Sequence, residues 1–415
     1  MPAFIGREEL ATTHADLRNL HDALESLPDV VFGGDLAAFG HAVGLSAEQV
    51  RLAVTSQAGR PLTRFTRADL YGTAAGFRLL EYNVGTQIGC MEQSAHVQAA
   101  LTGPLLADFA AEHRLGYVDT MTEYLNTMFA EAGIARDAQP VVGFVDWPKS
   151  YWGAQREGIE LSTEINNTVH GIDSVCGHVG ELEYRGGRVW LHGRRLDIVY
   201  RIFMLEHVVE PGGLELIEPL VAAEARGEVV VHTPIGCEAF ATKAALGLLS
   251  EHCDRRVFTP EQEASIGRIL PWSRITNPGT VVTPDGDRAD LLEYALAHRE
   301  ELALKATLQH GGWGITLGWE HSDDAWRDAV HRSMDGTFLL QQRIRPLTDA
   351  MPGPDGERVE YLFNWGMFTI APTAEQPGGY GGTAIRCAPV AANVGVIGLL
   401  GAAPGALFAG TMHEL

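Results

Sequence analysis

The sequence predicts a mixed α/β protein, and three observations predict it. Apolar runs alternate with helical patterns between residues 138 and 235, as in an open α/β sheet. Two alternating runs, 64–71 and 77–83, have Gly72 and Gly76 between them, which is typical of a β-hairpin. Apolar positions recur at helical spacing over residues 7–26 and, with a break near 103–104, over 91–132. The chain therefore combines helices, a hairpin and an open α/β sheet.

Further elements follow in order along the chain. Ser46 and Gln49 have the spacing of a capping box at the start of a short helix. Helices are also expected over residues 286–300 and 323–334. The remaining apolar runs predict strands at 141–147, 174–177, 188–192, 196–203, 229–232, 301–308, 337–344, 358–370 and 382–386.

Charge and cysteine usage exclude several classes of function. The 415 residues carry a net charge of −22 without a cluster of Lys or Arg, so no nucleic-acid partner is expected. The five cysteines are scattered and form no CxxC pair, which predicts neither a zinc site nor a disulfide framework. The N-terminus lacks a basic-then-apolar signal segment, and we expect a reduced, cytoplasmic protein.

Residues 389–410 form one long uncharged stretch. It is rich in Gly and Ala, contains Asn393 and Pro404, and has few large aliphatic side chains. This composition favours a buried strand and loop over a membrane helix. No membrane partner is expected.

Lysine is scarce in this chain. Only Lys149, Lys243 and Lys305 occur among 31 basic residues, so arginine occupies almost every basic position. A lysine under such a bias can mark a place where a compact ammonium is needed and a planar guanidinium does not serve. Chance remains the alternative for any one of the three.

The hairpin carries the strongest local signal for chemistry. With the turn centred at residue 75, Asp69 lies opposite Glu81 and Arg67 lies opposite Asn83. Directly opposed residues point to the same face, so two carboxylates and a carboxamide converge beside a guanidinium. Hard oxygen ligands of this kind suit Mg²⁺, which completes its shell with phosphate and water. An ordinary ion pair on a solvated hairpin face is the alternative.

A second signal is Lys305 at a strand end, followed by the Gly-rich loop that holds Gly311, Gly312 and Gly314. Such a loop can cover phosphates with backbone N–H groups, although Gly-rich hairpins without a ligand are common. Lys243 opens a helix after a strand, and Arg386 follows a pair of glycines. A P-loop is excluded because GxxxxGK[ST] is absent.

Other chemistries find less support in the residues. The chain has no GxSxG to supply a hydrolase nucleophile and no HExxH metal pair. Cys90 lies near His96, but a small residue in a tight loop after the hairpin is the favoured interpretation of this cysteine.

Taken in order, these motifs resemble the circularly permuted ATP-grasp family, represented by the synthetase domain of glutathionylspermidine synthetase. In that family the metal-binding hairpin precedes the nucleotide lid. The family pattern Arg-x-Asp and then Glu-x-Asn, with eleven residues between, is present as Arg67-Ala-Asp69 and Glu81-Tyr-Asn83. The segment 195–201, which ends in Arg201, is similar to the family's Val-Asp-Val-Ile-Tyr-Arg stretch.

The later motifs match in the same order. Lys243 matches the lysine that opens the lid, and Lys305 matches the second ATP lysine, before the loop of Gly311, Gly312 and Gly314. Residues 339–344, which include Gln341 and Gln342, are similar to the strand that meets adenine. Arg386 and Asn393 fall where late phosphate-side and metal-side residues are expected.

The resemblance implies a circularly permuted ATP-grasp fold in four segments. Residues 1–137 would form a core segment with the metal-binding hairpin, and 138–235 a pre-ATP-grasp-like α/β subdomain. Residues 236–346 would form the ATP-binding lid, and 347–415 the remainder of the core. A homodimer is possible.

The resemblance also implies a function. Mg²⁺ would bind Asp69, Glu81 and Asn83, while Arg67, Arg386, Lys243 and Lys305 would stabilise the transferring phosphoryl group of ATP. The acyl phosphate so formed would react with an amine to give an amide, with amino acids or small peptides as substrates and Arg201 near them. An ATP-dependent phosphotransferase and a nucleotide-binding scaffold without turnover are the alternatives.

Overall fold

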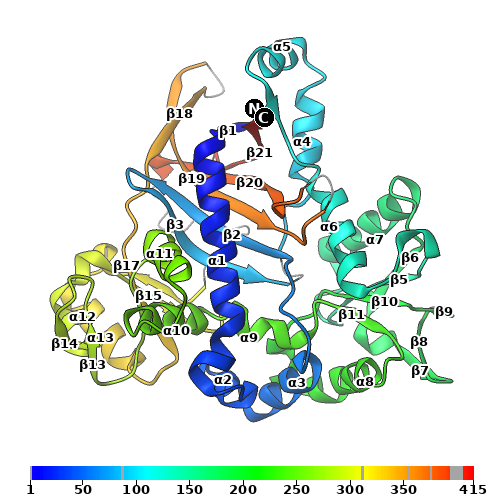
Figure 1. Ribbon diagram of the computed structural model, residues 1–415, viewed down its shortest axis with the longest axis horizontal. Helices are drawn as coiled ribbons and strands as arrows, with labels where there is room; N and C mark the ends of the chain where they lie inside the picture. Colours follow the sequence, from blue (N-terminus) through cyan, green and yellow to red (C-terminus); the bar gives the residue numbers. More distant parts are fainter. Residues whose placement is uncertain (1, 86–87, 310–312, 353–355, 374–375, 393–404) are drawn as a thin grey trace.

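The computed structural model describes residues 2–85, 88–309, 313–352, 356–373, 376–392 and 405–415 (Figure 1). These residues form a mixed α/β protein with one large sheet and two four-stranded sheets, together with smaller two- and three-stranded sheets. The mixed α/β class predicted from the sequence is confirmed at this level.

The largest sheet takes its strands from both ends of the chain. Its order is β1-β21-β20-β19-β2-β3, with β18 paired to β19 and β4 paired to β21. The pairs are antiparallel except for β1, which runs parallel to β21. The strands are β1 (Ala3–Ile5), β2 (Thr66–Thr73), β3 (Gly76–Val84), β4 (Leu115–Gly116), β18 (Thr348–Pro352), β19 (Arg358–Thr369), β20 (Tyr380–Pro389) and β21 (Leu407–Glu414).

One face of this sheet is covered by the long helix α1 (Arg7–Phe32), which crosses it beside α11 (Pro260–Ile269) (Figure 1). The buried stripe of α1 includes Leu17, Leu20 and Leu24. His21 Nδ1 of α1 lies 3.0 Å from the Tyr82 hydroxyl of β3. Neighbouring side chains of a strand alternate between faces, so Glu81 and Asn83 point away from α1.

The other face is partly covered by the helices between residues 93 and 132. They are α4 (Gln93–Ala100), α5 (Pro104–Glu112) and α6 (Thr120–Ala132), with β4 before α6. A Cβ on Gly410 of β21 would lie 2.4 Å from Val97 Cγ2, so α4 packs directly on this part of the sheet. The helical region expected over 91–132 is present, but β4 interrupts it because those residues pair with β21.

The first four-stranded sheet is parallel throughout, in the order β11-β10-β5-β6. Its strands are β5 (Val142–Asp146), β6 (Ser174–His178), β10 (Ile198–Arg201) and β11 (Val230–His232), with α7 (Gly153–Thr168) and α8 (Gly213–Ala225) between them in sequence. The strands predicted in this stretch are confirmed. A small three-stranded sheet, β7 (Glu183–Arg185), β8 (Arg188–Leu191) and β9 (Arg194–Arg195), projects beside it (Figure 1).

The second four-stranded sheet is antiparallel, in the order β12-β17-β15-β16. Its strands are β12 (Ser273–Ile275), β15 (Leu302–Ala306), β16 (Ile315–Leu317) and β17 (Phe338–Gln342). α10 (Lys243–Asp254) packs on one side, where a Cβ on Gly247 would lie 2.7 Å from Leu339 Cδ1. A separate core around Trp326 fixes α12 (Leu291–Ala297) and α13 (Asp323–Ser333) on the other side.

Short elements complete the described chain. They are α2 (Leu36–Ala42), α3 (Ala47–Gln57), α9 (Glu238–Ala241), β13 (Thr280–Val282) and β14 (Arg288–Asp290). The capping box predicted at Ser46 and Gln49 is confirmed at the start of α3. Of the uncharged stretch 389–410, β20 and β21 provide the ends, and 393–404 lie outside the described residues. No helix in the described part of the chain has the length and apolar character needed to cross a membrane.

Candidate functional site

The hairpin brings its polar side chains together as predicted. β2 and β3 pair Asp69 with Glu81 and Arg67 with Asn83. The turn itself is tighter than expected, because Thr73 pairs with Gly76 and Leu70 with Leu79. One extra residue in β3, Leu80, forms a bulge that shifts the register by one residue between the Leu70–Leu79 pair and the Asp69–Glu81 pair. The predicted pairs are therefore correct only because the bulge offsets the shorter turn.

Asp69 lies between two arginines on the sheet face that α1 leaves uncovered. Its carboxylate accepts hydrogen bonds from Arg67 Nε at 2.8 Å and from Arg386 Nη2 of β20 at 2.6 Å. All three side chains are buried. Burial by itself raises the pKa of Asp69, but the two guanidinium groups outweigh it and hold that pKa below its usual value. Asp69 is therefore a carboxylate at neutral pH.

A glycine makes this arrangement possible. Gly366 of β19 lies opposite Asp69, and a Cβ there would lie only 3.0 Å from Arg67 Cδ. Arg67 uses this space to extend across the sheet, where its Nη1 donates to the Gly89 carbonyl oxygen at 3.0 Å. Burial alone would lower the pKa of Arg67, but Asp69 raises it, so the guanidinium stays charged.

The two lysines predicted for ATP come from the antiparallel sheet and its helix and reach β3 at Glu81 and at its neighbour Leu80. Lys243, the first residue of α10, places Nζ 2.9 Å from Glu81 Oε1 and 2.6 Å from the Gln309 carbonyl oxygen. Lys305 Nζ of β15 donates to the Leu80 carbonyl oxygen at 3.0 Å and to Gln341 Oε1 at 2.6 Å. Both lysines are buried, and two of the three lysines of the chain thus meet at β3.

Burial also changes the acidity of one of these lysines. It lowers the pKa of Lys305 to about 8, an effect that Glu81 opposes and Lys243 reinforces. Four cationic side chains thus face two carboxylates, which leaves the site net positive. A net positive buried site suits a polyphosphate. The two carboxylates, which pair with these cations in the structure, could bind the divalent ion that accompanies the polyphosphate.

The donor set has the chemistry that Mg²⁺ requires, namely hard oxygens. Asn83 lies beside the pair of carboxylates, and its Nδ2 donates to the Arg67 carbonyl oxygen at 3.2 Å, which leaves the amide oxygen for another partner. Within the described ranges there is no cluster of three or more His, Cys, Asp or Glu that could hold a metal. A metal here would therefore depend on Asp69, Glu81 and Asn83 together with phosphate oxygens.

The remaining predicted nucleotide residues are only partly assembled. Gly314 has φ +68°, and its carbonyl oxygen accepts from the Ala306 backbone N–H at 2.9 Å, which closes the Gly-rich loop. Gln341 shares a face with Lys305, whereas Gln342 lies on the opposite face by strand alternation. Gly311, Gly312 and Asn393 lie outside the described residues.

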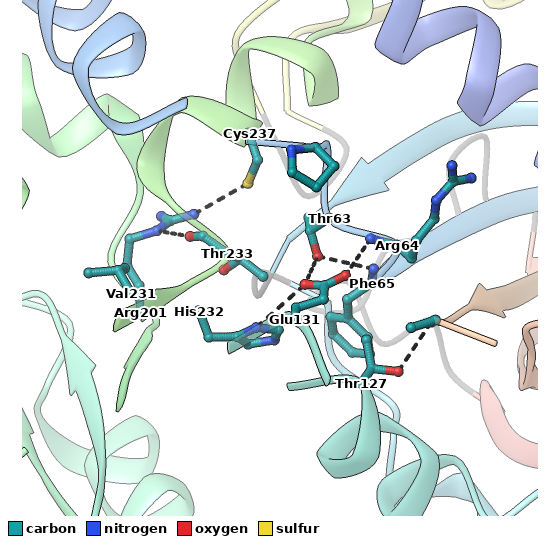
Figure 2. A network of polar contacts seen from close by, with 12 residues as sticks. Thr63, Arg64, Phe65, Thr127, Glu131, Arg201, Val231, His232, Thr233 and Cys237 are labelled. Atoms are coloured by element: carbon teal, nitrogen blue, oxygen red, sulfur yellow. Dashed lines mark hydrogen bonds and ion pairs between the residues drawn. The ribbon is translucent and has the colours of Figure 1, made fainter. Parts of the chain in front are cut away.

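Arg201 is not placed to bind a substrate. Its side chain is 1% exposed, Nε donates to the Thr233 carbonyl oxygen at 2.8 Å, and Nη1 pairs with Glu238. Figure 2 shows this guanidinium turned toward Thr233 and Cys237, beside the contact between Glu131 and His232. These contacts join the end of β10 to the segment before α10. The environment of Arg201 supports a structural role and does not support the substrate role expected from its position in the sequence.

Two site residues were missed from the sequence. Tyr71 follows Asp69 by two residues in β2, a spacing that could have placed it on the same face. Asn364 of β19 pairs with Arg386. No local pattern in the sequence marks it, because only the pairing of β19 with β20 brings it to the site.

The molecule shares its fold with a solved structure. A glutathione synthetase-like effector from Globodera pallida, solved in its apo form, matches with a TM-score of 0.59 at 12% sequence identity, over 99% of this chain and 88% of that one. At this identity the match shows the fold alone. The circular permutation and the division into four segments stay predictions.

Two further structures match less closely. They are a putative gamma-glutamylcysteine synthetase from Methylobacillus flagellatus, with a TM-score of 0.43 at 10% identity over 85% of this chain and 81% of that one, and a D-alanyl-alanine synthetase A from Vibrio cholerae, with a TM-score of 0.27 at 13% identity over 57% and 68%. Scores this low support no statement about this chain. No protein-family model matches the sequence, and no curated protein is similar to it in sequence.

Proposed function

We propose that this protein is an ATP-dependent carboxylate–amine ligase, which forms an amide between amino acids or small peptides and releases ADP and phosphate. The observation that carries the proposal is the hairpin pair Asp69 and Glu81 enclosed by four cations from four different elements. A net positive set of charges, most of them buried, marks a candidate functional site on physical grounds. The fold shared with a glutathione synthetase-like protein agrees with this class of reaction.

The two lysines would receive the phosphates of ATP. Lys243 of α10 and Lys305 of the antiparallel sheet both approach the hairpin, so a nucleotide held under that sheet would place its phosphates beside Glu81. Its adenine would lie near β17, where Gln341 already binds Lys305. Phosphate oxygens would then be partners of Lys243, and the Glu81 carboxylate beside them would act as a metal ligand.

Phosphoryl transfer would take place next to Asp69. Mg²⁺, when bound by Asp69, Glu81 and Asn83, supplies charge neutralisation for the triphosphate. Arg67 and Arg386 flank Asp69 and can stabilise charge on the γ-phosphoryl group as it passes to the substrate carboxylate. The acyl phosphate then reacts with the amine. Because acyl phosphates hydrolyse readily, the site must exclude water, and the burial of Arg67, Asp69 and Arg386 agrees with that need.

The proposal is tested by ADP release with Mg-ATP across a matrix of amino acids, singly and in pairs, with mass spectrometry of the products. Pair-dependent ADP and a product with the mass of two substrates minus water are the expected results. ADP or a phosphorylated product from one substrate alone, without a condensation product from any pair, would favour a phosphotransferase. Absence of ADP with every combination would favour a scaffold that binds the nucleotide without turnover.

A further inference from the structure

A buried carboxamide on the site face has an oxygen without a partner. Asn364 of β19 is 4% exposed, and its Oδ1 is one of the buried side-chain atoms that make no hydrogen bond within the described chain. An unsatisfied buried acceptor costs stability, so such an atom in a folded protein needs a reason.

The sheet register places Asn364 beside the proposed phosphoryl-transfer residues. Asn364 pairs with Arg386, whose Nη2 binds Asp69, and it lies two residues before Gly366, the register partner of Asp69. Alternation along β19 therefore directs Asn364 to the same face as Asp69. Among the unpartnered buried atoms of the described residues, those of Thr369, Thr411 and His413 also belong to this sheet, but alternation directs them to the opposite face.

Asn364 lies on the side of Asp69 that is remote from the lysines. Lys243 and Lys305 meet the sheet at β3, its last strand, whereas Asn364 and Arg386 lie on β19 and β20, beyond β2. In an in-line transfer the γ-phosphoryl group lies between ADP and the attacking oxygen. If the nucleotide phosphates occupy the β3 side, the attacking carboxylate comes from the β19 and β20 side.

The surroundings of Asn364 specify the chemistry of this substrate. Arg386 presents a guanidinium, and Tyr71, two residues after Asp69 in β2 and therefore on the same face, presents a phenol O–H that can donate a hydrogen bond. Both groups suit a carboxylate. The Asn364 oxygen only accepts, so it requires an N–H or O–H on the same molecule.

We propose that Asn364 binds the acyl-donor substrate and selects a carboxylic acid that carries a hydrogen-bond donor near the reacting group, namely an amino acid. This inference rests on the proposed function. A buried acceptor of this kind discriminates strongly, because an analogue without the donor leaves the oxygen unsatisfied in the complex.

The test compares substrates and variants at a fixed amine. For each L-amino acid that acts as acyl donor, kcat/KM for ADP release is measured beside that of the same acid without its amino group. The variants are Asn364→Leu, which removes the acceptor and keeps the branching at Cγ, and Thr369→Val, which removes an unpartnered buried oxygen of the same strand on the opposite face. We expect the wild type and Thr369→Val to prefer the amino acid by at least tenfold, and Asn364→Leu to lose about tenfold of that preference with the KM for ATP unchanged.

Each outcome decides the inference. A preference that survives in Asn364→Leu, or a wild type without preference, would overturn the role of Asn364 and leave the ligase proposal intact. A wild type that forms no condensation product with any pair would overturn the ligase proposal and this inference with it. If Asn364→Leu lacks a cooperative thermal transition, Asn364→Ala is used in its place. The same loss or survival of the amino-acid preference then supports or overturns the role of Asn364.

Discussion

Asp69→Asn is the sharpest perturbation of the candidate site. The substitution keeps the shape of the side chain but removes its charge and replaces one acceptor oxygen with an amide donor. The native carboxylate accepts from Arg67 Nε at 2.8 Å, Arg67 Nη2 at 3.2 Å and Arg386 Nη2 at 2.6 Å, and all three residues are buried. The variant therefore removes the charge of the one carboxylate to which both buried guanidinium groups donate.

The expected cost follows from this environment. Removing one partner of a buried ion pair typically costs about 3–5 kcal/mol of unfolding free energy, and the retained amide oxygen places Asp69→Asn near the lower end. Loss of one group that stabilises the transferring phosphoryl should lower kcat by about 10²–10³-fold. The pKa of Asp69 is depressed below its unfolded value, so its contribution to stability is present at neutral pH and is lost as the pH falls through the folded pKa.

The assay combines urea unfolding with ADP release, measured where every variant is folded. Asp16→Asn is the matched control, because Asp16 is a buried carboxylate that binds Arg268 with no contact to the site. Since the Arg268 side chain is 56% exposed and can turn to water, the control should lose less stability and keep its kcat. Near-normal turnover of folded Asp69→Asn would refute the assignment of Asp69 to the reacting centre.

Three further predictions concern single side chains. Lys243→Met should raise the KM for ATP by tenfold or more because it removes a charged partner of the phosphates, whereas Lys149→Met, whose lysine is 70% exposed, should leave it unchanged in steady-state kinetics. Burial lowers the pKa of Lys305 from 10.5 to about 8, so kcat/KM for ATP should fall as the pH rises through 8. Between pH 8 and 10.5 the unfolded chain binds more protons at Lys305 than the folded chain does, so the contribution of Lys305 to the free energy of unfolding should rise as the pH rises. In pH-dependent unfolding, Lys305→Met should abolish this trend. Arg201→Met should cost about 3–5 kcal/mol in denaturant unfolding because it leaves Glu238 buried, yet the folded variant should keep its substrate KM; a selective rise in KM would restore a substrate role for Arg201.

Local pattern was sufficient for most of the fold. Alternation predicted β2 and β3, apolar runs predicted the strands of the parallel sheet, and helical spacing predicted α1. The misses have tertiary causes. β4 lies within a helical pattern because its pairing partner, β21, is almost three hundred residues away in sequence. Similarly, Arg288–Asp290 forms a strand with β13 at the start of a predicted helix, so the helix begins only at Leu291.

The residues of the candidate site likewise fall into a group that local pattern predicts and a group that only tertiary contacts bring together. The sequence by itself determined that Arg67, Asp69, Glu81 and Asn83 share one face, because strand alternation and a hairpin turn are local rules. Lysine scarcity singled out Lys243 and Lys305 without showing where they lie. Only the tertiary structure decided that both lysines reach β3, that Arg386 reaches Asp69, and that Arg201 is used within the core. The physical reason is that such contacts depend on the pairing and packing of distant segments, which are set by burial of the whole core and not by any local pattern.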